Sequence, residues 1–141
     1  MTQAAMKTEP APTTAKKMLS FDNVELYYDH VYALKGVSIE LMEGETVALI
    51  GANGAGKSSI LRAITGLRKI KSGTISYLGD RIDGRPAAEI VTRGIAMVPE
   101  GRKLFPSLSV EENLLVGGHA RRRGPWTLAQ IYALFPILGE R

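Results

Sequence analysis

Apolar and polar positions alternate in the first part of the chain, as they do in strands with one buried face. Residues 18–28 follow this alternation with one slip near Asp22 and Asn23, and residues 37–41 follow it without interruption. The two segments predict antiparallel strands. A turn at residues 43–45 then leads into the apolar run at residues 46–50, which predicts a buried strand of a parallel sheet.

Further along the chain the spacing of apolar residues becomes helical. Residues 57–67 place Ile60, Leu61, Ile64 and Leu67 on one helical face. The next segments predict a strand at 74–78, a short helix at 87–91 and a core strand of the parallel sheet at 95–98. A loop is expected at 99–109, followed by a helix that begins with a capping box at Ser109. Residues 126–135 form a further stripe of apolar residues at helical spacing. Strands that alternate with helices predict an α/β fold with an antiparallel β subdomain at its start.

The N-terminal residues differ in composition from the rest of the chain. Residues 1–17 contain no aromatic or branched aliphatic side chain, and Pro10 and Pro12 interrupt any helix. Such a segment buries too little apolar surface to offset the entropy lost on ordering. We therefore expect a disordered leader at 1–17 and a folded domain portion at 18–141.

The predicted buried strand ends at a glycine-rich segment with a known chemistry. Residues 51–58 read GANGAGKS, which fits the phosphate-binding P-loop pattern G-x-x-x-x-G-K-[ST]. Glycines allow positive φ and close approach of an anion, while successive N–H groups and the following helix N-terminus attract phosphate. Lys57 is expected to reach the β- and γ-phosphates, and Ser58 to bind Mg²⁺. The residues expected to contact nucleotide here are Gly51, Asn53, Gly54, Ala55, Gly56, Lys57, Ser58 and Ser59. A chance glycine-rich turn is the alternative, which the strand before and the helix after disfavour.

Composition narrows the class of protein further. The chain has no cysteine and only two histidines, which excludes disulfides and thiolate chemistry and disfavours a histidine cluster for zinc. No apolar run approaches the roughly 18 residues of a membrane span, and the N-terminus lacks the apolar core of a signal peptide. The sequence thus predicts a cytoplasmic protein. The net charge of +4 comes largely from the tail and from residues 121–123, and no aromatic residues are interleaved with these cations, so no nucleic-acid partner is expected.

Several motifs together resemble the ATP-binding subunits of ABC transporters. They are the aromatic-ended strand at 18–28, the P-loop, VPEGR at 98–102, LFPSLSVEENL at 104–114 and a second LFP at 134–136. The most similar branch energises uptake of branched-chain amino acids, and the resemblance covers residues 19–141. It implies that Tyr28 stacks on adenine. It also implies that Glu100 occupies the place of the Q-loop glutamine, which touches Mg²⁺ and the water near the γ-phosphate.

Three later motifs of that family are not found in this sequence: the LSGGQ signature, the Walker B strand with its carboxylates, and the switch histidine. The chain therefore resembles the N-terminal portion of the domain, truncated in the helical subdomain, with no complete catalytic set. The resemblance implies ATP and Mg²⁺ as cofactors. It implies a second ATP-binding subunit and transmembrane permease subunits as partners, and a position at the inner face of the cell membrane without a span of its own.

Two functions of different class remain open at this point. One is an ATPase subunit that energises amino-acid import. The other is a nucleotide-binding module that does not hydrolyse ATP, which we expect of these 141 residues alone. A P-loop kinase or GTPase is disfavoured, because it has no need of the antiparallel strands before the P-loop or of the VPEGR and SVEENL segments.

Overall fold

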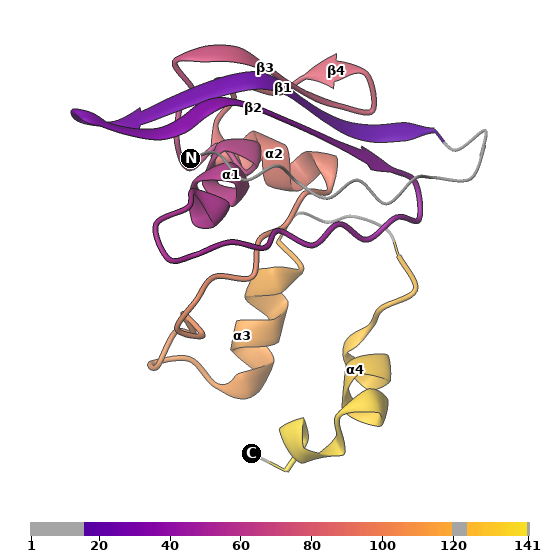
Figure 1. Cartoon of the computed structure of the whole chain (residues 1–141). Helices are drawn as coiled ribbons and strands as arrows, with labels where there is room; N and C mark the ends of the chain where they lie inside the picture. The colour runs from indigo at the N-terminus through magenta and orange to yellow at the C-terminus, as the bar shows by residue number, and fades with distance from the viewer. Residues whose placement is uncertain (1–15, 120–123, 141) are drawn as a thin grey trace. The chain divides into compact units, whose positions relative to one another are not determined.

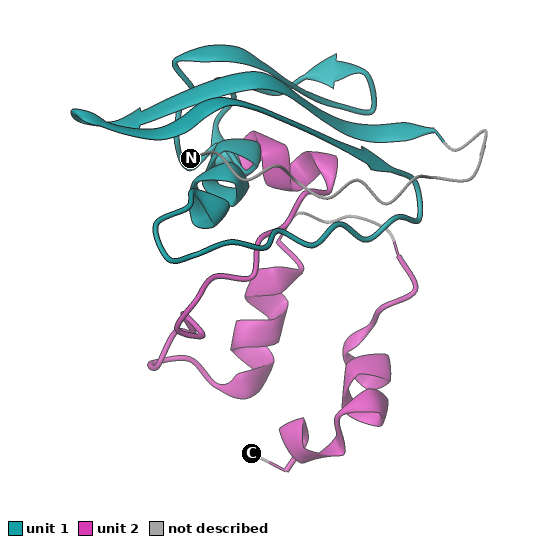
Figure 2. Cartoon of the chain, in the orientation of Figure 1, with its two compact units in different colours: residues 1–87 teal, residues 88–141 magenta. Residues whose placement is uncertain are grey.

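The computed structural model describes residues 16–119 and 124–140, and the chain divides into two compact units, residues 1–87 and 88–141 (Figure 2). Most of the expected leader and the basic residues 121–123 lie outside the described residues. The leader ends earlier than the predicted residue 17. Lys17 already begins a strand, and the carbonyl of Lys16 accepts a hydrogen bond of 2.9 Å from the N–H of Glu43.

Unit 1 contains a four-stranded antiparallel sheet (Figure 1). Its strands are β1 (Lys17–Tyr28), β2 (Val31–Met42), β3 (Ser72–Tyr77) and β4 (Asp80–Arg81), in the spatial order β2-β1-β3-β4. The strands predicted at 18–28, 37–41 and 74–78 are confirmed. The second begins earlier than predicted, because a two-residue turn joins β1 directly to β2 and pairs Tyr28 with Val31.

The slip in the alternation of β1 is a β-bulge. The pairing register of β1 with β2 shifts between Phe21 and Val24, and Asn23 adopts a φ of 45°. The extra residue keeps Phe21 and Val24 both fully buried. Both neighbouring strands meet this bulge with a glycine, Gly36 in β2 and Gly73 in β3, where a Cβ would lie 2.8 Å from the Asn23 Oδ1 and 2.4 Å from the Asn23 carbonyl oxygen, respectively.

The helix α1 (Lys57–Ile64) belongs to the same unit and lies below the sheet in Figure 1. Its buried residues are Ser59, Ile60 and Ala63. The apolar stripe predicted through residue 67 is therefore wrong at two positions, since Leu61 is 45% exposed and Leu67 is 51% exposed. The helix ends early because the Thr65 hydroxyl bonds back to the carbonyl of Leu61 at 2.8 Å and Gly66 takes a φ of 71°.

The core of unit 1 collects apolar side chains from strands, helix and loop. Its fully buried members include Phe21, Val24, Leu26, Leu34, Ile75 and Ile82. Each such side chain contributes about 1.5–3 kcal/mol relative to an exposed one. Burial is thus concentrated in β1, in the strands on either side of it, and in the segment after β4.

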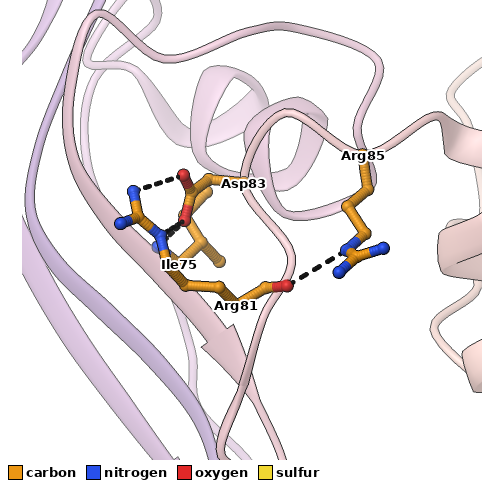
Figure 3. Close-up of polar contacts among 4 residues, drawn as sticks. All are labelled: Ile75, Arg81, Asp83 and Arg85. Carbon is orange, nitrogen blue, oxygen red and sulfur yellow. Dashed lines mark hydrogen bonds and ion pairs between the residues drawn. The ribbon is translucent and has the colours of Figure 1, made fainter.

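A carboxylate continues the β3–β4 ladder beyond its last backbone pair (Figure 3). Asp83 Oδ1 accepts a hydrogen bond from the backbone N–H of Ile75 at 3.0 Å and another from Arg81 Nε at 3.0 Å, while Arg81 Nη2 reaches Oδ2 at 2.8 Å. The side chain of Asp83 is only 12% exposed. Arg85 Nε closes the turn by donating to the carbonyl of Arg81 at 3.2 Å.

The two strands expected for a parallel sheet do not form. Residues 46–50 and 95–98 form neither strand nor helix, and within the described residues the only sheet is the antiparallel one. Ile50 is 94% exposed and Val98 is 96% exposed. A parallel strand is stable only between neighbours that supply hydrogen bonds and cover both faces. Neither segment has such neighbours in the described chain.

Unit 2 holds the remaining helices. They are α2 (Ala87–Arg93), which begins at the unit boundary, α3 (Val110–Gly117), α4 (Leu128–Leu134) and the 3₁₀ turn η1 (Pro136–Leu138). The helices expected after Pro86 and at Ser109 are confirmed. A helix also forms within the stripe at 126–135, but Leu134 and Phe135 are 57% and 53% exposed, so these two residues do not belong to a core.

Side-chain caps fix the beginnings of α3 and α4. Ser109 accepts from the N–H of Glu112 at 3.2 Å while the Glu112 carboxylate accepts from the N–H of Ser109 at 2.7 Å, which is the predicted capping box. Thr127 and Gln130 form a second box before α4. The hydrogen bond from the Ser109 N–H is the main reason that the pKa of Glu112 lies below its usual value.

Candidate functional site: the P-loop and Tyr28

The P-loop follows the unpaired segment 46–50 and turns directly into α1. Gly54 and Gly56 have φ values of 82° and 94°, and the N–H of Ala55 donates to the carbonyl of Ala52 at 3.1 Å. These positive φ values are the left-handed conformations for which glycine is suited. The expected positive φ is therefore confirmed at Gly54 and Gly56 but not at Gly51.

Lys57 holds its own loop together. Its Nζ donates to the carbonyl of Gly51 at 2.7 Å and to that of Ala52 at 2.8 Å. The ammonium group consequently lies against the start of the loop that is expected to surround phosphate. A cation held there places positive charge beside any anion that the loop binds.

The N-terminus of α1 lacks the usual protein caps. Its N-cap residue Gly56 has no side chain to accept a hydrogen bond, and the first turn contains no acidic residue. The first N–H groups of a helix have no partners within it and carry a partial positive charge. Ser58 is exposed at this end, so its hydroxyl is accessible to a ligand or ion. Ser59 is only 8% exposed and turns inward.

Gly56 also has a packing role. A Cβ at this position would lie 2.8 Å from Leu34 Cδ2 and 2.9 Å from the carbonyl oxygen of Ala33. Both atoms belong to β2. The backbone of Gly56, at the start of α1, therefore packs directly against β2 and leaves no room for a side chain.

Tyr28, at the end of β1, contacts the helix that the P-loop starts. Its hydroxyl oxygen accepts long hydrogen bonds from Ser59 Oγ at 3.4 Å and from Arg62 Nη1 at 3.5 Å. The guanidinium carbon of Arg68 lies 4.7 Å from the centroid of the Tyr28 ring, in cation–π geometry. Burial alone raises the pKa of Tyr28, but the hydrogen bonds from Ser59 and Arg62 and the charges of both arginines outweigh it, so the net shift is downward.

The adjacent Tyr27 has a different environment. Its ring stacks on Tyr32 of β2 with centroids 4.3 Å apart and planes 9° from parallel. Tyr32 interacts in turn with the carboxylate of Glu25, which is the first cause of the raised pKa of the Tyr32 hydroxyl. Tyr28 is therefore the tyrosine of this pair that contacts α1.

Sequence reasoning missed the two arginines around Tyr28. Arg62 follows Ser59 by three residues in a helix, a spacing that places them on one face and is visible in the sequence. Arg68 lies 40 residues from Tyr28 in a loop after the helix, and no sequence pattern links the two.

Glu100 belongs to unit 2, whereas Tyr28 and the P-loop belong to unit 1. It occupies an exposed turn, next to Gly101, Arg102 and Lys103, all of which have positive φ. Within the part of the chain that the structure describes, no three acidic or histidine side chains gather to hold a metal ion. In that same part, every helix is too short or too polar to cross a bilayer.

The sequence is similar to those of transport ATP-binding proteins. The high-affinity branched-chain amino acid transport ATP-binding protein BraG of Pseudomonas aeruginosa is 46% identical over 126 residues, which cover 88% of this chain and 54% of BraG. The sn-glycerol-3-phosphate import ATP-binding protein UgpC of Brucella abortus is 45% identical over 97 residues, covering 68% of this chain and 27% of UgpC. The chain thus spans about half, or less, of the length of these relatives.

Solved structures give the same result for the fold. A nucleotide-free ATP-binding cassette from an ABC transporter superposes with a TM-score of 0.67 at 27% identity, over 89% of this chain and 48% of the cassette. A dimeric bacterial ABC transporter cassette superposes with a TM-score of 0.68 at 28% identity, over 80% of this chain and 52% of the cassette. The expected fold class, an ABC-type P-loop domain of which the chain holds a part, is confirmed. The family model described as ABC transporter matches residues 34–139, and this chain belongs to that family.

Proposed function

We propose that this chain is part of the ATP-binding subunit of an ABC transporter, in which the P-loop holds the phosphates of ATP and Tyr28 stacks on the adenine. The observation that carries the proposal is the uncapped N-terminus of α1, which follows glycines of positive φ and carries Lys57 at its first position. A helix end with free N–H groups, a nearby ammonium and no competing carboxylate fits a polyphosphate.

Each residue of the site has a separate role in this proposal. Backbone N–H groups of residues 53–59 surround the β- and γ-phosphates, and Lys57 neutralises their charge. The Ser58 hydroxyl would be one ligand of Mg²⁺, which commonly keeps few protein ligands. When bound, the ion would neutralise part of the phosphate charge. Glu100 is proposed to act near the γ-phosphate and the metal, as the Q-loop residue does in the family.

The transported substrate is proposed to be a branched-chain amino acid. BraG, named for such transport, matches 88% of this chain, whereas UgpC, named for glycerol-3-phosphate import, matches 68% at similar identity. Transmembrane permease subunits and a second ATP-binding subunit are the proposed partners. They would hold the protein at the cytoplasmic face of the membrane.

The alternative is a module that binds nucleotide without hydrolysing it. It is supported by the placement of the described acidic residues in turns, caps and strand surfaces, such as Glu43, Glu112 and Glu40. No buried strand ends in a carboxylate among the described residues. Both functions require the same nucleotide contacts at the P-loop.

Calorimetric titration with ATP and Mg²⁺ tests the shared part of the two functions. Lys57→Ala is expected to weaken binding about ten- to a hundredfold, since a charge-assisted hydrogen bond contributes about 1.5–3 kcal/mol. Lys103→Ala, which removes an exposed lysine of unit 2, is the matched control and is expected to bind as the unchanged chain does. Equal affinities of the Lys57 and Lys103 variants would refute the assignment of the P-loop as a phosphate site.

A further inference from the structure

Three side chains from α1 and the loop after it contact Tyr28. Ser59 and Arg62 contact its hydroxyl, and the Arg68 guanidinium covers one of its faces at 4.7 Å from the centroid. Arg68 is exposed, so its guanidinium group contacts water as well as the Tyr28 ring. A guanidinium group is planar and weakly hydrated, which makes it the cation best suited to stack on an aromatic face.

Arg68 and the P-loop adjoin opposite ends of α1 along the chain. Arg68 follows the C-terminal end of α1, which lies at Ile64, whereas the P-loop precedes its N-terminal end. The tyrosine hydroxyl reaches Ser59, in the first turn of the helix. Among the described residues no other ring or cation is stacked on Tyr28. One face of the half-buried Tyr28 ring is therefore covered by Arg68, and no described ring or cation stacks on the other face.

We propose that Arg68 is a positioning residue for the nucleotide base, which backs Tyr28 so that the opposite ring face receives adenine in an Arg68–Tyr28–adenine stack. This inference rests on the proposed function, because it needs a nucleotide at the P-loop. Arg68 does not touch the phosphates. It acts by keeping the tyrosine ring in its binding orientation before the nucleotide arrives, which lowers the entropy lost when the base binds.

The effect of Arg68 should therefore depend on the base. Ordering one side chain costs an amount equivalent to about a two- to tenfold change in affinity. Arg68→Ala is expected to weaken ATP binding by that factor and to leave the binding of inorganic tripolyphosphate unchanged. Arg68→Lys, which keeps the charge but lacks the planar group, is expected to recover only part of the loss.

The experiment is a set of calorimetric titrations with Mg·ATP and with inorganic tripolyphosphate. It compares the unchanged chain with Arg68→Ala, Arg68→Lys, Tyr28→Ala and the double variant Tyr28→Ala/Arg68→Ala. Lys69→Ala serves as the charge control, because it removes a neighbouring cation that is not stacked on Tyr28. If Arg68 acts through Tyr28, the double variant binds ATP as weakly as Tyr28→Ala alone. Unfolding by urea identifies any variant that loses its fold. If Arg68→Ala is unfolded, the comparison of Arg68→Lys with the unchanged chain provides the test.

Several outcomes would overturn the inference. Arg68→Ala that binds ATP more tightly would show that Arg68 occupies the face needed by adenine. Equal losses for ATP and tripolyphosphate, or equal losses for Arg68→Ala and Lys69→Ala, would show a general effect of charge. Failure of the proposed function is distinguishable, because the unchanged chain would then bind neither ATP nor tripolyphosphate.

Discussion

The carbonyl of Asn23 in β1 approaches Gly73 of β3 so closely that a Cβ at position 73 would lie 2.4 Å from the carbonyl oxygen. Gly73 also has a φ of 89°, and the Asp22 carbonyl lies 2.6 Å from the same Cβ position. The bulge in β1 therefore requires a glycine at position 73 of β3. This pair joins the strand that ends at Tyr28 to the strand that follows the Arg68 loop.

Gly73→Ala is expected to destabilise unit 1 more than Gly79→Ala does. Gly79 has a similar φ of 92° but open space around it, so its substitution carries only the conformational cost, about 1–2 kcal/mol. Steric overlap at Gly73 adds about 1–3 kcal/mol. Urea unfolding followed by circular dichroism measures both free energies of unfolding. Equal losses would mean that the β1–β3 contact relaxes without cost.

The bidentate pair of Arg81 and Asp83 gives a second prediction. Asp83→Ala removes the partner of Arg81 and leaves the N–H of Ile75 without its acceptor, so we expect a loss of about 1.5–3 kcal/mol. Arg81→Ala removes only a side chain that is 65% exposed, and a loss of about 0–1 kcal/mol is expected. Chemical denaturation measures the free energy of unfolding of each variant. A larger loss for Arg81→Ala would assign the stability to the ion pair and contradict the role of the Ile75 hydrogen bond.

The same carboxylate predicts a dependence of stability on pH. The hydrogen bond from Arg81, with a smaller one from Ile75, holds the pKa of Asp83 below its usual value despite the opposing effect of burial. A group whose pKa is lower in the folded state stabilises the fold above its unfolded pKa of about 3.9, and that contribution is lost as the pH falls through the folded pKa. The difference in free energy of unfolding between the unchanged chain and Asp83→Ala should therefore be constant near neutral pH and shrink below about pH 4. Urea titrations from pH 7 to pH 3 measure it, and a difference that grows in acid would contradict the sign.

Asn113 is expected to hold the loop before α3. Its Nδ2 donates to the carbonyls of Phe105, Leu108 and Ser109 at 3.1, 3.2 and 2.9 Å, and its Oδ1 accepts from the N–H of Phe105 at 2.9 Å. Asn113→Asp keeps an acceptor and loses the donors, so amide hydrogen exchange of residues 105–109 should become faster. Glu111→Gln, two residues away in the same helix and on an exposed side chain, should leave it unchanged. Unchanged exchange in Asn113→Asp would show that the loop does not depend on these bonds.

We expect no ATP turnover above background from these 141 residues alone. Hydrolysis at a P-loop needs a residue that positions water and an acid that supports Mg²⁺, and no described strand ends in such a carboxylate. A phosphate-release assay with Mg·ATP measures turnover. Steady release that disappears with Lys57→Ala would contradict this expectation.

Local patterns in the sequence predicted local structure well. The alternation in residues 18–28 predicted β1, with a slip near Asn23 that the structure shows to be a bulge, and the spacing of Ser109 and Glu112 predicted the cap of α3. Each of these features depends on residues close to one another in the chain or on one repeated spacing. The P-loop was predicted for the same reason, because its motif is continuous.

Features that depend on distant partners were not predictable in the same way. Residues 46–50 have the composition of a buried strand, yet burial requires neighbouring strands that the described residues do not provide. The helical stripe at Leu67 likewise continued in the sequence beyond the point where Gly66 ends α1. The contact of Arg68 with Tyr28 joins residues 40 positions apart and needs the fold itself to bring them together.

The unpaired segment 46–50 also bears on how the polypeptide behaves in concentrated solution. Its exposed Val47 and Ile50 and its free backbone groups offer a template to which a strand of another molecule can add. The segment has no proline and no charge, the two features that usually prevent such addition. Self-association of the purified chain should consequently increase with concentration, and Ile50→Lys should extend the range over which the chain stays monomeric.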